Sequence, residues 1–122
     1  MATYVTFEVP DDIQQKVLEL FAVSKSSGKV KKGTNEVTKA IERGTAKFVL
    51  IAKDVEPPEI VMHLPALCDE KAVPFIFVKT KKQVGEAVGV TVPTASAVIL
   101  DAGEGKNMLS EIKEKLATYK KK

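Results

Sequence analysis

The 122-residue sequence has little of several residue types on which common active sites depend. It contains one cysteine, Cys68, one histidine, His63, and no tryptophan. A single cysteine excludes an internal disulfide and a cysteine-based metal cluster, and it favours a reducing compartment. The sequence shows no signal-peptide pattern and no apolar run near the roughly 18 residues needed to span a bilayer. We therefore expect a soluble protein of the cytoplasm that makes no membrane contact.

The sequence also lacks a recognisable catalytic or cofactor motif. His63 lies in an expected helix with no evident nucleophile or carboxylate partner, so we interpret it as structural, and Cys68 in its apolar context as a packed side chain. The run Gly103–Lys106 resembles part of a phosphate-binding loop. It lacks the first glycine of that motif, and Asn107 stands where a Ser or Thr would hold magnesium. We predict a protein that is not an enzyme and that uses no cofactor or metal.

Apolar spacing and chain-breaking residues predict the secondary structure. A chain of this length with 44% apolar residues supports one hydrophobic core, so we expect a single domain over residues 1–122. Continuous apolar runs are typical of strands that are covered on both faces. The alternation of such runs with amphipathic helices predicts a three-layer α/β/α sandwich around a mixed sheet of about four strands. We expect helices at 11–26, 57–63, 64–71 after a break at Pro65, and 81–88, and strands at 29–32, 48–52, 75–78 and 97–100. A further helix carries the apolar stripe Val37, Ala40 and Ile41 and ends at Gly44, and a last helix carries Met108, Leu109, Ile112 and Leu116 and ends near Tyr119.

The net positive charge of the chain is small, but its lysines are concentrated in one segment. The net charge of +3 is too small to indicate a nucleic-acid partner by itself. No acidic residue lies between Glu19 and Glu36, however, and this interval gives one face a local positive field that attracts phosphates. Its lysines are Lys25, Lys29, Lys31 and Lys32.

The most informative stretch is KVKKGTNEVTKAIERG, residues 29–44. A short basic strand runs through one glycine into a helix whose start offers free backbone N–H groups and a positive dipole end. Asn35, Glu36 and Lys39 project from one side of that helix start, and they offer an amide, a carboxylate and an ammonium to base edges. The alternative is that Glu36 and Lys39 pair with each other on a solvated surface, which would be favoured if the neighbouring basic strand were absent.

A second segment, residues 88–97, is a loop rich in small and β-branched residues. Val90 and Val92 are able to cap an unstacked base or contact a sugar there. The sequence gives equal support to the alternative that both valines pack into the core beneath the loop.

Together the segments KKGTNEVTKAIERG, VEPPEIVMHLPALCDEKAVPFIFV and VGEAVGV closely resemble archaeal ribosomal protein L-seven-Ae and its kink-turn-binding relatives. The resemblance runs nearly end to end. It implies an α/β/α sandwich that grips a kink-turn, an RNA bend in which two helices flank a bulge and tandem sheared G·A pairs.

The resemblance also implies roles for individual residues. The motif around Gly33 would contact the bend and its guanines, flanking cations would hold phosphates, and a separate pocket closed by the 88–97 loop would take the flipped-out bulge nucleotide. Some eukaryotic relatives carry arginine where this chain has Val92, so their base selectivity should not be transferred. The implied residues that contact the bend and its guanines are Gly33, Asn35, Glu36 and Lys39, and Thr34 belongs to the same RNA-binding motif. The implied phosphate-binding residues are Lys32 and Arg43, the bulge-pocket residues Glu56, Ile60 and Lys81, and the loop residues Val90, Thr91, Val92 and Ala95.

The same resemblance implies several RNA partners. They are large-subunit 23S rRNA, box C/D and box H/ACA guide RNAs and archaeal RNase P RNA, together with the core proteins of the ribosome and of those particles. We expect a monomer when the protein is free. The chief competing hypothesis is a protein–protein adaptor on the same fold, in which changes at Lys32, Asn35, Glu36 and Lys39 would leave partner binding intact.

Overall fold

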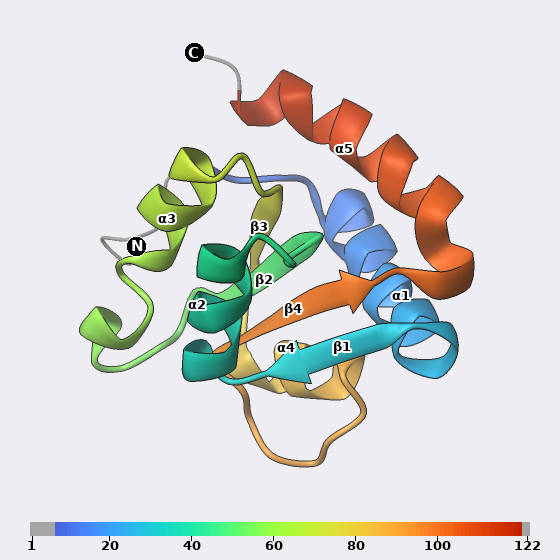
Figure 1. Ribbon diagram of the computed structural model, residues 1–122. Coiled ribbons are helices and arrows are strands. Elements are labelled where there is room, and N and C mark those ends of the chain that lie inside the picture. The colour runs from blue at the N-terminus through green and yellow to red at the C-terminus, as the bar shows by residue number, and fades with distance from the viewer. Residues whose placement is uncertain (1–6, 121–122) are drawn as a thin grey trace.

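The computed structural model describes residues 7–120 and contains one four-stranded mixed sheet (Figure 1). The strands lie in the order β1-β4-β2-β3. β2 pairs in parallel with β3, whereas β4 runs antiparallel to both β1 and β2. β1 (Lys29–Lys32) therefore forms an edge of the sheet, β2 (Phe48–Ala52) and β4 (Ser96–Asp101) are central, and β3 (Phe75–Val78) forms the other edge.

Helices cover both faces of this sheet, so the predicted three-layer α/β/α fold with four strands is confirmed. α2 and α3 lie on one face, α1 and α4 pack on the other, and α5 packs beside α1 at the periphery (Figure 1). The helices are α1 (Asp11–Ser27), α2 (Thr34–Arg43), α3 (Leu64–Glu70), α4 (Lys81–Ala87) and α5 (Lys106–Lys120), with 3₁₀ turns η1 (Pro58–Ile60) and η2 (Gly103–Gly105).

The core is centred on the two middle strands. All five residues of β2 are buried, as expected for a strand that is covered on both faces. Phe21 of α1 meets Phe48 of β2 edge to face with ring centroids 6.3 Å apart, and Phe75 meets Phe77 at 5.6 Å. Such aromatic pairs add stability beyond that of the area they bury.

The predicted helical path through residues 57–71 is wrong in one respect. The prediction placed a helix from Pro57 to His63 and a break at Pro65. Instead only the short turn η1 forms after Pro57, and α3 begins at Leu64 with Pro65 in its first turn. Proline is tolerated there because the N–H groups of the first turn have no intrahelical acceptor, so Pro65 opens α3 instead of interrupting it.

Within residues 7–120, no helix is long and apolar enough to cross a membrane.

Candidate nucleic-acid interface

The junction between β1 and α2 is a sharp turn at Gly33. Its φ is +95°, a backbone conformation that L side chains rarely adopt, and no atom lies within 4 Å of the place where a Cβ would stand. Backbone geometry rather than crowding therefore requires glycine. The Gly33 N–H donates to the Ser96 carbonyl at 2.9 Å, and its own carbonyl accepts from the Val37 N–H at 3.0 Å. The turn is thus held by β4 on one side and by α2 on the other.

No side chain caps the start of α2. Thr34, the first helical residue, hydrogen-bonds through Oγ1 to the buried Ser96 Oγ at 3.1 Å instead. The first N–H groups of a helix have no intrahelical acceptor, and they carry the positive end of the helix dipole. The start of α2 consequently offers donors and partial positive charge to a ligand.

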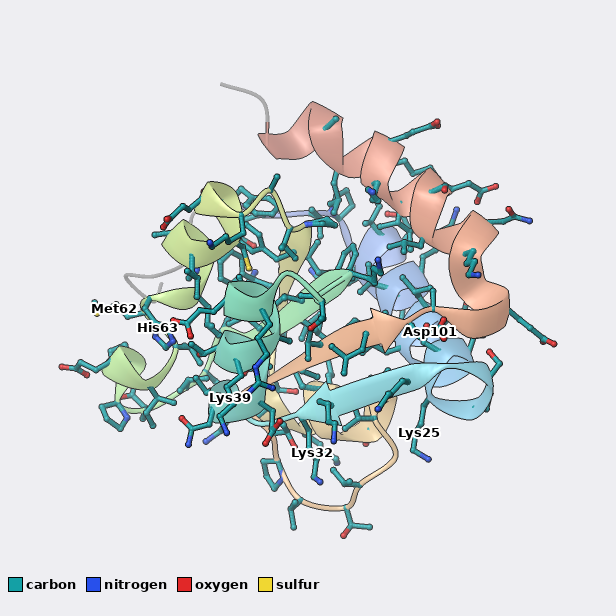
Figure 2. The ribbon with its side chains drawn as sticks, in the orientation of Figure 1. Lys25, Lys32, Lys39, Met62, His63 and Asp101 are labelled. Carbon is teal, nitrogen blue, oxygen red and sulfur yellow. The ribbon has the colours of Figure 1, made fainter. Side chains whose placement is uncertain are left out.

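Asn35, Glu36, Lys39 and Arg43 are all exposed on α2, as the sequence predicted. The last three line one wall of a groove of about 230 Å³, and β1 contributes lysines to it. Figure 2 shows Lys39 on the outer side of α2. Within residues 7–120, Glu36 and Lys39 form no ion pair with each other, so the structure gives no support to the alternative that they neutralise one another. The carboxylate of Glu36 and the cations of Lys39 and Arg43 are therefore accessible to a partner.

Within the described part of the chain, only Lys81 of the three residues predicted to form the bulge pocket has hydrogen bonds that fix its place next to the 88–97 loop. Lys81 is tied to its surroundings, because its N–H donates to Asp54 Oδ1 at 2.8 Å and its carbonyl accepts from the Thr94 N–H at 3.1 Å. Glu56 and Ile60 lie in the exposed segment before α3, where Ile60 is 43% exposed. The structure thus places Lys81 beside the 88–97 loop, while the grouping of all three residues stays a prediction.

In the loop after α4, Val90 and Val92 differ in their exposure to solvent. Val90 is half-buried and packs against the core, whereas Val92 is 58% exposed. The loop folds back onto α4 at buried Gly85, where an added Cβ would collide with the Val92 carbonyl oxygen, and the Val90 N–H donates to the Gly85 carbonyl at 3.0 Å. The packing alternative therefore holds for Val90, while contact of the exposed Val92 with a base or sugar stays a prediction.

The remaining predicted loop residues lie on either side of that exposed tip. Thr91 is exposed, and Ala95 is half-buried, with its carbonyl accepting from the Ala52 N–H at 3.0 Å. Thr94 Oγ1 donates to the Val92 carbonyl at 3.3 Å. The loop is therefore anchored to β2 at one end and presents Thr91 and Val92 at its tip.

His63 is exposed and not buried, but it does connect two elements. Its Nε2 lies 2.8 Å from Thr38 Oγ1, so the start of α3 is hydrogen-bonded to α2. Cys68 is buried, in agreement with the expected packing role. Both placements agree with structural interpretations of these two residues.

Sequence reasoning missed Ser96 and the role of Gly85. Ser96 accepts from Gly33 through its carbonyl and contacts Thr34 through its hydroxyl, yet it lies 62 residues from Thr34 in sequence. Finding it requires the pairing of β1 with β4, which no local pattern reveals. Gly85 and Gly89 lie four residues apart in the sequence, but this spacing does not indicate where the loop after α4 lies.

Comparisons with known proteins agree with this geometry. The family model described as "Ribosomal protein L7Ae/L30e/S12e/Gadd45 family" matches residues 15–109. Among solved structures, the chain is similar to the 15.5kD RNA binding protein of Giardia lamblia, with a TM-score of 0.90 and 34% sequence identity. That match covers 97% of this chain and 98% of the other. The likeness therefore extends over the whole sandwich, including the β1–α2 junction and the loop after α4.

Proposed function

This chain is a member of the ribosomal protein L7Ae/L30e/S12e/Gadd45 family, and we propose that it binds RNA without catalysis as a component of ribonucleoprotein particles. The similar Giardia lamblia structure is that of an RNA-binding protein, which supports an RNA partner. The observation that carries the proposal is the β1–α2 junction. There an uncapped helix start, a glycine turn and exposed, unpaired polar side chains adjoin a basic strand.

The specific RNA in this proposal is the kink-turn. The sheared G·A pairs of a kink-turn present guanine edges unlike those of Watson–Crick pairs, and Asn35, Glu36 and Lys39 offer the donors and acceptors to read them. Lys32 and Arg43 would neutralise phosphates that the bend brings together. A protein that binds only the bent form shifts the RNA toward that form by its differential affinity for the two states. The product of binding is thus a shaped RNA.

A single local bend occurs in many RNAs, so one protein can serve several particles. We propose that the chain binds large-subunit 23S rRNA, nucleates box C/D and box H/ACA guide RNA particles and joins an archaeal-type RNase P. Partner proteins in those particles would supply methylation, pseudouridylation or cleavage. The bulge nucleotide of each kink-turn would enter the region of Glu56, Ile60 and Lys81, under the exposed tip at Val92.

The test is a titration of the protein against two RNAs at one stated salt concentration. One RNA carries a kink-turn, and the other has its G·A pairs replaced by Watson–Crick pairs. We expect tight binding to the first alone, and loss of that binding in a folded Asn35→Ala, Glu36→Ala, Lys39→Ala triple variant. Equal weak binding to both RNAs would overturn the proposal and favour the protein–protein adaptor.

A further inference from the structure

A second groove lies on the α1 side of β1. Most of the residues that line it are not among those predicted to contact RNA. It encloses about 580 Å³. Its walls are the C-terminal end of α1, the edge strand β1 and the start of the loop that follows α4. The lining residues that carry the argument are Lys25, Val30, Lys32, Glu36, Gly89 and Val90.

The chemistry of this groove is two-sided. Val30 and Val90 are half-buried and supply an apolar floor, while the lining includes four lysines and a single acid, Glu36. A nucleotide has the matching division into a flat, largely apolar base and an anionic phosphate, and the volume falls within the roughly 300–1,000 Å³ usual for such sites. Figure 2 shows Lys25 and Lys32 reaching to the same side of β1.

Lys25 is the residue that distinguishes this groove from an ordinary basic edge. Lysines on an edge strand deter pairing with another chain, and that role explains Lys29, Lys31 and Lys32 without any ligand. Lys25 lies on α1 and has no such role. Its side chain passes directly over Gly89, where an added Cβ would stand 2.6 Å from Lys25 Cε and 2.9 Å from Nζ. The φ of +78° accounts for glycine at this position, and Lys25 lies over it among the residues that line the groove.

The groove is continuous with the β1–α2 junction, since Lys32 and Glu36 belong to both. We propose that it binds an unpaired nucleotide of the RNA held at that junction, with the base on Val30 and Val90 and the phosphate between Lys25 and Lys32. This inference rests on the proposed function, because the groove is filled by the same RNA molecule. It enlarges the RNA-binding surface across the edge strand to the opposite face of the sheet.

The experiment compares Lys25→Gln with Lys71→Gln, a matched loss of one charge from an exposed lysine beyond α3. Each variant and the wild-type protein are titrated against a kink-turn RNA with fully paired stems and against versions with three uridines inserted beside the kink in either strand. One single-strand phosphate contact contributes a slope of about 0.7 in log K against log salt, which corresponds to about five-fold in affinity at about 0.1 M salt. We expect Lys25→Gln to lose about that factor, and that slope, on one uridine-containing RNA only.

Two further measurements identify the occupant. The methyl resonances of Val30 and Val90 should shift more on adding the uridine-containing RNA than on adding the paired one, and uridine monophosphate alone should shift them only at far higher concentration. Thermal unfolding should show that both variants are folded.

Each contrary result has its own meaning. The inference would be overturned if Lys25→Gln and Lys71→Gln had the same affinity for every RNA. It would also be overturned if Lys25→Gln lost equal affinity for the paired and the uridine-containing RNAs, or if the free nucleotide bound as tightly as the RNA. Failure of the proposed function shows differently, as equal binding of the wild-type protein to the kink-turn RNA and its Watson–Crick counterpart.

Discussion

At the scale of single residues, Gly33 offers the cleanest test of the β1–α2 junction. Gly33→Ala adds no clash but forces an L side chain to φ +95° and ψ +141°, which costs about 1–3 kcal/mol of stability. Any distortion of the turn would also move the N–H groups and side chains that start α2. We expect Gly33→Ala to lower both the free energy of unfolding, measured in urea, and the affinity for kink-turn RNA.

Gly44 provides the matched control at the other end of α2. Its φ is +77°, and it likewise has open space where a Cβ would stand. Gly44 is in the left-handed helical region, so Gly44→Ala should cost about 1 kcal/mol of stability and leave RNA affinity unchanged. Equal RNA affinities for the two variants would show that the Gly33 turn does not position the interface.

Glu36 is the residue to which we assign base reading. A carboxylate accepts hydrogen bonds from the donor edge of a guanine. Its removal should therefore cost about 1–3 kcal/mol of binding free energy for the correct base. Glu36→Ala should weaken binding to kink-turn RNA and change binding to a plain duplex little, as measured by titration. Glu42→Ala, an exposed acid on the same helix, is the control for charge. Equal changes on kinked and duplex RNA after Glu36→Ala would contradict base reading.

At the scale of elements, α4 is fixed at its start by a capping box. Thr80 Oγ1 accepts from the Gln83 N–H at 3.1 Å, and Gln83 Oε1 accepts from the Thr80 N–H at 3.2 Å. Thr80→Ala should lower the free energy of unfolding by about 1 kcal/mol. Because Lys81 holds Thr94, the same change should also loosen the loop tip and raise hydrogen exchange there. Thr91→Ala, in the exposed tip, should change stability by less than about 0.5 kcal/mol, and a similar loss in both variants would argue against the cap.

The packing of α5 on α1 brings two cations together. The nearby ammonium of Lys16 lowers the pKa of Lys115, while the carboxylates of Glu111 and Asp12 oppose that shift. Because the lysine pKa is lower in the folded state than in the unfolded state, protonation of this lysine opposes folding. Its contribution to the free energy of unfolding therefore rises as pH increases from the folded-state pKa to the unfolded-state pKa. Lys16→Gln should move the Lys115 titration to higher pH in a lysine side-chain NMR experiment. An unchanged titration would contradict contact between the two side chains.

The elements themselves were largely predictable from sequence. The apolar runs of β2 and β3 and the buried stripe Val37, Ala40 and Ile41 of α2 are local signals, and the structure confirms them. Pro65 was assigned wrongly because a proline at the first turn of a helix and one that breaks a helix read alike in sequence. At the site, exposure of Asn35, Glu36 and Lys39 follows from helical spacing alone. The hydrogen bonds of Ser96, the place of Lys25 over Gly89 and the opposite fates of Val90 and Val92 depend on tertiary contacts that no local pattern contains.

At the scale of the whole molecule, the sandwich places the RNA-binding elements along one edge of the sheet. β1 is an edge strand, α2 rises from its end, and the loop after α4 lies beside it (Figure 1). Cations thus line both sides of β1, with Lys39 and Arg43 on one face and Lys25 on the other. A rigid surface of this kind can hold two RNA segments that meet at an angle, because the protein and not the RNA supplies the fixed geometry.

The central claim is that this protein stabilises a bent RNA. The most direct measurement is energy transfer between dyes at the two stem ends of a kink-turn RNA, in low salt and without divalent cations, as protein is added. We predict a large rise in transfer with the wild-type protein, little with the Asn35→Ala, Glu36→Ala, Lys39→Ala variant, and none for the RNA with Watson–Crick pairs in place of its G·A pairs. Binding without a rise in transfer, or an equal rise for both RNAs, would contradict the claim.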